Sequence, residues 1–181
     1  MNQSAAAETV SFWREAGPEK WFEQDDDFDF TIRSRFLAAH EAAARGELAT
    51  FEGNAEGALA LVLLLDQFPR NMFRGSARAF ATDPLARAAA ERALARGFDQ
   101  PTDEMMRSFF YLPFMHSELM ADQERCVGLY RALGDPKHLG YALAHRDIVA
   151  KFGRFPHRNR ALGRATTQAE QEFLDSGGFT G

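Results

Sequence analysis

The stretch Ala58 to Leu65 constrains the fold more than any other part of the sequence, because every residue in it is apolar. A helix that is apolar on all sides has to be surrounded by the rest of the protein. Asn54 can cap this helix, and Pro69 predicts its end at Phe68, since proline disfavours helical geometry in the preceding residue. We therefore expect a central, fully buried helix. The stretch is also far too short to span a bilayer.

Capping residues, prolines and glycines divide the rest of the chain into further helices, and no segment shows the sustained alternation of a β-strand. These signals predict an all-α protein of about eight to ten helices in antiparallel pairs, a tetratricopeptide-like α-α superhelix. The other expected helices are Glu8 to Ala16, Pro18 to Phe22, Asp25 to about Gly46, Asp83-Pro84 to Gly97, one from Thr102, Ser117 to Leu133, Lys137 to Phe152, and Thr167 to about Asp175.

A chain of 181 residues with 45% hydrophobic residues fits a single domain around one core. We expect one domain over residues 1–181, with residues 1–7 mobile and the short helices of residues 8–24 packed on it. The start of the chain lacks the basic and apolar segments of a signal peptide. The single cysteine, Cys126, excludes an intrachain disulfide, a zinc ribbon and a CxxC redox pair, so a cytoplasmic location is expected.

Charge and motifs exclude several classes of function. The net charge of -5 argues against a general nucleic-acid binder. No segment is suited to a membrane, and the sequence has no phosphate-binding glycine loop, GxGxxG motif or nucleophile elbow. No cofactor and no metal are therefore expected.

Residues 1–30 hold eight acids against Arg14 and Lys20, whereas residues 146–164 hold six basic residues against Asp147. These segments either attract one another or form ion pairs within the fold.

The segment Leu65 to Gly75 places charged side chains at the C-terminal end of the most apolar helix. Asp66 opposes the helix dipole there, at about 0.3–1 kcal/mol, and near a core it needs a cationic partner. The candidate partners are Arg70, Arg74, Arg154 and Arg158. One interpretation is that the two arginine-bearing turns converge into a socket that binds a carboxylate or phosphate. The other is a structural network of ion pairs.

Histidines occur in three places near acids or arginines. His116 and His145 each precede an acid, Glu118 or Asp147, by two residues, but side chains at that spacing point about 200° apart on a helix and form no shared metal site. His145 lies on a stripe with Tyr141, Ile148 and Phe152, which is typical of a core residue. His157 follows a proline in an arginine-rich turn, where cationic neighbours would lower its pKa and suit it to act as a base.

Several phrases together resemble the bacterial DUF924 family over nearly the whole chain. The matching phrases are Phe12-Trp13, Trp21-Phe22, Phe28-Asp29, Ile32-Arg33, Leu64 to Asn71, Phe73-Arg74-Gly75, Phe110 to Glu118, His145-Arg146-Asp147 and Phe152 to Asn159. The resemblance implies a tetratricopeptide-like fold and no established activity, since the family is named as a domain of unknown function. The signature residues that it implies here are Asp66, Gln67, Arg70, Asn71, Arg74, His116, Ser117, Glu118, His145, Asp147, Arg154, His157, Arg158 and Asn159.

Three functional hypotheses follow. The first is a helical binding domain whose pocket, lined by these signature residues, holds a small anionic molecule or an acidic peptide end. Its apolar walls would be Phe73, Tyr111, Phe114, Phe152 and Phe155. The second is a hydrolase or transferase that uses the same pocket. In it, His157 or His116 transfers protons, and Glu118 or Asp66 orients that histidine. The third is a protein-interaction scaffold without pocket chemistry.

Overall fold

A computed structural model describes residues 3–21 and 23–178, and the regular secondary structure of this part of the chain is helical, with no β-strand. The all-α prediction is confirmed. Contacts between Cα atoms group the chain into two compact units, and the expected single domain stays a prediction. The N-terminal unit comprises Met1–Arg74 and Arg78–Pro113, and the C-terminal unit comprises Gly75–Ala77 and Phe114–Gly181. The superhelical stacking of all the helices stays a prediction.

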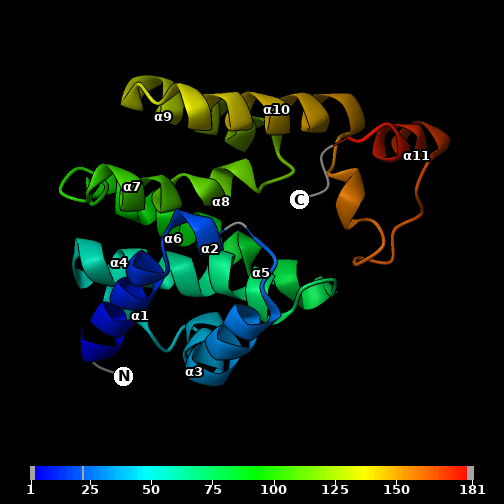
Figure 1. The fold of residues 1–181 in the computed structure, drawn as a ribbon. Coiled ribbons are helices and arrows are strands. Elements are labelled where there is room, and N and C mark those ends of the chain that lie inside the picture. The colour runs from blue at the N-terminus through cyan, green and yellow to red at the C-terminus, as the bar shows by residue number, and fades with distance from the viewer. Residues whose placement is uncertain (1–2, 22, 179–181) are drawn as a thin grey trace. The chain divides into compact units, whose positions relative to one another are not determined.

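The N-terminal unit contains a longer first helix than the sequence predicted (Figure 1). This helix begins at Gln3 rather than Glu8, and Ala6 is buried. The expected mobility of residues 1–7 stays a prediction. Residues 1–2 lie outside the described residues. The elements up to the boundary of the unit are α1 (Gln3–Ala16), α2 (Pro18–Trp21), α3 (Asp26–Ala44), η1 (Ala49–Gly53), α4 (Ala55–Val62), η2 (Leu63–Gln67), α5 (Phe68–Met72), η3 (Ala77–Phe80), α6 (Asp83–Ala95), α7 (Glu104–Arg107), η4 (Ser108–Phe110) and α8 (Leu112–Met115).

The predicted central helix is the core of this unit. Every residue from Ala58 to Leu65 is at most 5% exposed, and α1 and α6 pack against α4. The Asn54 side chain accepts the N–H of Gly57 at 2.8 Å, which confirms the predicted cap. An aromatic cluster adjoins this helix, in which the rings of Trp13 and Phe68 lie 5.4 Å apart. Burial of these rings and of the apolar helix supplies the hydrophobic stabilisation of the unit.

The expected helix end at Phe68 is wrong, because the chain passes through a π-helical turn, η2, and continues as α5. The N–H of Phe68 donates to the carbonyl of Leu63 rather than to that of Leu64. His40 Nδ1 instead donates to the Leu64 carbonyl at 2.9 Å. Pro69 has no N–H for the Leu65 carbonyl, and the Thr82 hydroxyl donates to it at 2.6 Å. Two side chains thus replace the missing backbone donors and let the helix run past the proline.

The C-terminal unit is built on a helical hairpin, α9 (Met120–Leu133) and α10 (Pro136–Phe152), whose members lie side by side (Figure 1). Gly134 joins them in the left-handed conformation, with φ of 74°. The chain then forms the short turn η5 (Pro156–Arg158) and the last helix of the described residues, α11 (Gln168–Asp175), in which Thr167 and Glu170 form a capping box. A small core of apolar side chains joins α10 to η5 and α11.

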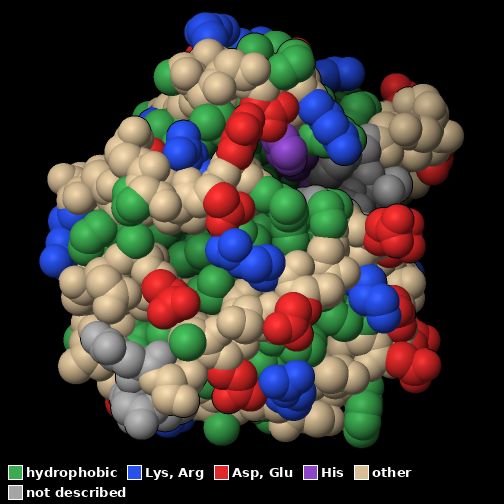
Figure 2. Space-filling view, turned by 60° about the vertical axis from the view of Figure 1, so that its left-hand side comes forward, with side chains coloured by type: hydrophobic (Ala, Val, Ile, Leu, Met, Phe, Trp, Pro, Cys, Tyr) green, Lys and Arg blue, Asp and Glu red, His purple; other side chains and the backbone are tan. Residues whose placement is uncertain are grey.

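None of the helices within residues 3–21 and 23–178 combines the length and the apolar character needed to cross a membrane. On the face drawn in Figure 2, acidic and basic side chains are interspersed among exposed apolar ones. The charged groups of this face therefore act locally rather than as one field of a single sign.

Candidate functional site

In the N-terminal unit, Asp66 is fully buried and has the cationic partner that the sequence predicted. Arg70 Nη1 lies 3.4 Å from Asp66 Oδ1, and the Gln67 amide donates to Oδ2 at 2.5 Å. The same guanidinium donates two hydrogen bonds to Asp83, at 2.8 and 3.0 Å. Burial by itself would lower the pKa of Arg70, but the charges of Asp66 and Asp83 outweigh it and raise that pKa. Arg70 is thus a charged bridge between two carboxylates.

The second arginine of this turn is also engaged. Arg74 donates two hydrogen bonds to Asp29, at 2.8 and 3.0 Å, and the Asn71 amide donates to the same carboxylate at 2.7 Å. The turn therefore contains three carboxylates against two guanidinium groups, a formal sum of -1. This arrangement favours the structural ion-pair interpretation for the part of the motif that lies in the N-terminal unit.

Sequence reasoning missed four residues that hold this turn in place: Asp29, His40, Thr82 and Asp83. Asp83 was interpreted as a helix cap, but the cap position is Thr82, and the Asp83 side chain turns to Arg70. Asp29 was indistinguishable from the other acids at the start of α3. His40 is buried, and burial lowers its pKa, so the neutral ring serves as the donor to the π-helical turn.

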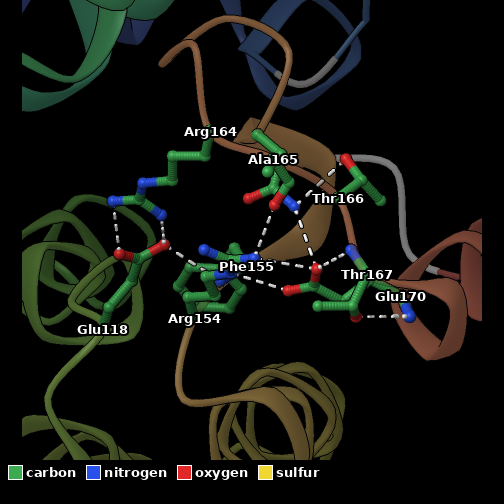
Figure 3. Close-up of polar contacts among 9 residues, drawn as sticks. Glu118, Arg154, Phe155, Arg164, Ala165, Thr166, Thr167 and Glu170 are labelled. Carbon is green, nitrogen blue, oxygen red and sulfur yellow. Dashed lines mark hydrogen bonds and ion pairs between the residues drawn. The ribbon is translucent and has the colours of Figure 1, made fainter.

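In the C-terminal unit, Glu118 holds the turn that follows α10 (Figure 3). Its carboxylate accepts the N–H of Phe155 at 2.9 Å and two hydrogen bonds from Arg164, both at 2.8 Å. Partial burial tends to raise the pKa of Glu118, but the bonds from Arg164 and the Phe155 N–H outweigh it and lower that pKa. Glu118 is therefore an ionised anchor near neutral pH. Arg164, its partner, was not among the predicted site residues.

A second carboxylate, Glu170 at the start of α11, holds the other side of the same turn (Figure 3). Arg154 donates to it at 2.6 and 2.8 Å, the N–H of Thr167 donates at 2.8 Å, and the Asn159 amide lies within 3.3 Å. The hydrogen bonds from Arg154, followed by those from Thr167, lower the pKa of Glu170 to about 2. The turn is thus fixed by two ionised carboxylates, each bound by a different arginine.

Arg158, the last residue of η5, is only 6% exposed. Its Nη1 donates to the carbonyl of His116 at 3.0 Å, and its guanidinium lies 4.5 Å from the centre of the Phe155 ring. The ring of His157 packs at 5.6 Å from the same phenyl ring. The structure therefore gathers six predicted site residues around one turn: His116, Glu118, Arg154, His157, Arg158 and Asn159.

His145 is in the same unit, but its contacts differ from those of this polar cluster. Its Nδ1 donates to the Tyr141 carbonyl at 2.8 Å, and its ring meets Phe155 edge-on at 5.6 Å. These contacts are those of a packed core histidine. The predicted apolar stripe fails at Tyr141, which is 51% exposed. Asp147 pairs with Arg146 at 2.7 Å.

The residues proposed as apolar pocket walls are mainly core. Phe73, Tyr111, Phe114 and Phe155 are buried, and Phe152 packs against Phe173. Within the described part of the chain, no three side chains of His, Cys, Asp or Glu come together as a group that could hold a metal ion.

Comparison with known proteins relates the whole chain to one family. A family model, described as a bacterial protein of unknown function (DUF924), matches residues 9–178. A solved structure of ATU0120, a protein of unknown function from Agrobacterium tumefaciens, is 52% identical, with a TM-score of 0.93 over 96% of this chain and 98% of that chain. No protein with a curated description matches the chain. These likenesses concern sequence and fold, and none carries a named activity.

Proposed function

Because this chain belongs to the DUF924 family of bacterial proteins of unknown function, its activity has to be argued from its own residues, and we propose that it is a helical binding protein for a small anion. The proposed ligand group is a carboxylate or a phosphate, carried by a metabolite or by the acidic end of a peptide. The proposed site is the turn from Phe155 to Asn159 in the C-terminal unit.

The observation that carries the proposal is the excess of positive charge around this turn, where Arg154, Arg158 and Arg164 are gathered with only two carboxylates, Glu118 and Glu170. Glu118 is bound by Arg164 and Glu170 by Arg154, so these five charged groups sum to +1 before either neighbouring histidine is protonated. A guanidinium in a largely dehydrated turn suits two-point binding of a carboxylate or phosphate, because its planar fork matches their oxygens.

The same geometry favours binding over catalysis at this turn. An acid–base catalyst must exchange its proton near the working pH. The bonds from Arg164 and the Phe155 N–H lower the pKa of Glu118 and keep it ionised, so it supports the turn better than it would relay protons. His157 and His116 are then expected to supply ring nitrogens to a bound anion rather than to form a dyad with Glu118.

The test is a thermal-shift and calorimetric titration with inorganic phosphate, followed by phosphorylated and carboxylated metabolites. Arg158→Gln is compared with Arg160→Gln, which removes an exposed charge from the adjoining position. At a ligand concentration 100 times Kd, binding stabilises the native state by about 2.7 kcal/mol. Sodium chloride at matched ionic strength controls for general screening.

We expect at least one anion to raise the Tm of the wild type and of Arg160→Gln, and to leave that of Arg158→Gln unchanged relative to its own baseline. Using each variant's own baseline separates ligand binding from any loss of stability. If no anion raises the Tm more than sodium chloride does, or if Arg158→Gln responds as the wild type does, the proposal is wrong.

A further inference from the structure

The N-terminal unit contains an open groove of about 420 Å³ between α1, α2 and α3. Its lining includes Phe12, Glu15, Lys20, Asp27, Phe28 and Arg35, and none of the predicted site residues is part of it. A space of this size is within the range of ligand-binding sites, about 300–1,000 Å³. The groove therefore needs an explanation of its own.

Aromatic side chains form one wall of the groove. The rings of Phe12 and Phe28 stack with centroids 5.6 Å apart and an interplanar angle of 11°. Phe28 is buried, whereas Phe12 is partly exposed and also packs on Phe36 at 4.9 Å. Lys20 lies over the Phe28 ring at 5.5 Å and Arg35 over the Phe12 ring at 4.7 Å, so the part of this wall that a ligand can reach is the partly exposed Phe12.

The charged residues of the groove differ in how they are paired. Lys20 lies 3.4 Å from Asp25, and Arg35 lies 2.9 Å from Glu8. The side chains of Glu15 and Asp27 form no ion pair or hydrogen bond with any other described residue. The cations of the groove thus have acidic partners, while two of its carboxylates are available to a ligand.

The charge of the groove and its partners is negative. Four acids, Glu8, Glu15, Asp25 and Asp27, stand against the two cations, which gives a formal sum of -2. Such a surface attracts a positively charged partner and opposes an anionic one.

An exposed aromatic residue lies beside the groove. Phe30 is 72% exposed and follows Asp27 by three residues on α3, so the two side chains are neighbours on the helix surface. A large aromatic ring in water next to a groove is typical of a contact surface for another protein. A small amine seated between α1 and α3 would not use this ring, but a peptide that leaves the groove over α3 would.

We propose that this groove docks a basic peptide segment of a partner protein. A Lys or Arg side chain of the segment pairs with Glu15 and Asp27, and an adjacent apolar side chain packs against the partly exposed ring of Phe12. The peptide then continues across Phe30. This interaction is independent of the anion site in the C-terminal unit.

The test uses the full chain and a labelled peptide that is rich in Lys and Arg and has one central Phe. Binding is followed by fluorescence anisotropy for the wild type, the double variant Glu15→Gln with Asp27→Asn, and Phe30→Ser. The matched control is Glu19→Gln with Asp26→Asn, which removes two exposed charges from α2 and α3 outside the groove lining. A peptide of equal charge without the Phe, and the small amine spermidine, complete the set.

We expect the groove variant to bind the peptide about five- to tenfold more weakly than the control variant does, because it loses two ion pairs at the exposed edge of the groove. Phe30→Ser and the peptide without Phe should also bind more weakly, and added salt should weaken every complex. Equal binding by the groove and control variants would overturn the proposal, as would the absence of peptide binding. Competition by spermidine with no effect of Phe30→Ser would assign the groove to a small cation instead. Self-association abolished by the groove variant would assign it to a second copy of the chain.

Discussion

Replacing Glu170 by Gln should destabilise the protein near neutral pH and have a much smaller effect in acid. Glutamine has the size of glutamate, and its side-chain oxygen can still accept the hydrogen bond from the Thr167 N–H. The change therefore removes the charge and keeps most of the helix cap. Glu170 is 2% exposed and its pKa is lowered to about 2, from an ordinary value of 4.5. At about 1.36 kcal/mol for each pKa unit, this difference corresponds to about 3 kcal/mol at pH 7.

The expected loss is smaller than that limit, because the partner Arg154 is partly exposed and water screens the pair. We therefore expect about 2 kcal/mol at pH 7, or a decrease in Tm of roughly 4–8 °C for a chain of this size. The folded-state pKa is the lower one, so the stabilisation is fully present above the unfolded-state value of about 4.5 and disappears as the pH falls towards 2. At pH 3, less than half of it should remain.

The assay is urea unfolding followed by circular dichroism at pH 7 and pH 3, with Glu172→Gln as the control. Glu172 is exposed on the same helix, where it accepts a hydrogen bond only from Gln168 among the described residues, and its replacement should change stability by less than about 0.5 kcal/mol. Comparing the two variants at each pH cancels the general effect of acid. A difference below about 0.5 kcal/mol at pH 7, or an equal difference at both pH values, would refute the reasoning.

Two further predictions concern buried groups. Thr82→Val removes the hydroxyl that donates to the Leu65 carbonyl and leaves that buried acceptor without its side-chain donor, so urea unfolding should show a loss of about 1–3 kcal/mol. A loss below about 0.5 kcal/mol would mean that the passage through Pro69 does not depend on Thr82. Burial raises the pKa of the Cys126 thiol to about 12. A thiol reagent at pH 8 should therefore modify Cys126 only as fast as the native protein opens. The rate of modification is measured by absorbance with and without urea. Rapid modification without urea would contradict the buried position.

Features determined by neighbouring residues could be predicted from the sequence. Asp25 and Asn54 cap the helices that follow them, and Thr167 forms a capping box with Glu170, because each of these bonds spans only three residues. The apolar stretch from Ala58 to Leu65 identified the central helix, since complete apolarity leaves no face for water.

Features that depend on distant residues could not be predicted in this way. The helix end at Phe68 was a sound local inference, but His40 and Thr82, from other helices, supply the donors that Pro69 and the π-helical turn take away. Arg74 pairs with Asp29, 45 residues earlier, and no spacing in the sequence distinguishes that acid from its neighbours.

The predicted site shows the same contrast between local features and features that depend on distant residues. The sequence identified Arg70, Arg74, Arg154 and Arg158 but not Arg164, and the partners of all these arginines follow from the tertiary structure. In the first turn Asp29, Asp66 and Asp83 outnumber the two arginines, whereas around the second turn Arg154, Arg158 and Arg164 outnumber Glu118 and Glu170. This difference in partners is why the proposed anion site lies in the C-terminal unit.

The most direct test of anion binding is a titration with phosphate observed through the side-chain N–H signals of ¹⁵N-labelled arginines. The Arg158 signal can be assigned by its loss in Arg158→Lys, and the signals of Arg154 and Arg164 serve as internal controls. We predict a saturable change in the Arg158 signal, with little change in the two arginines that are bound to Glu170 and Glu118. A spectrum that does not change, or one in which all arginine signals drift together without saturation, would contradict an anion site at this turn.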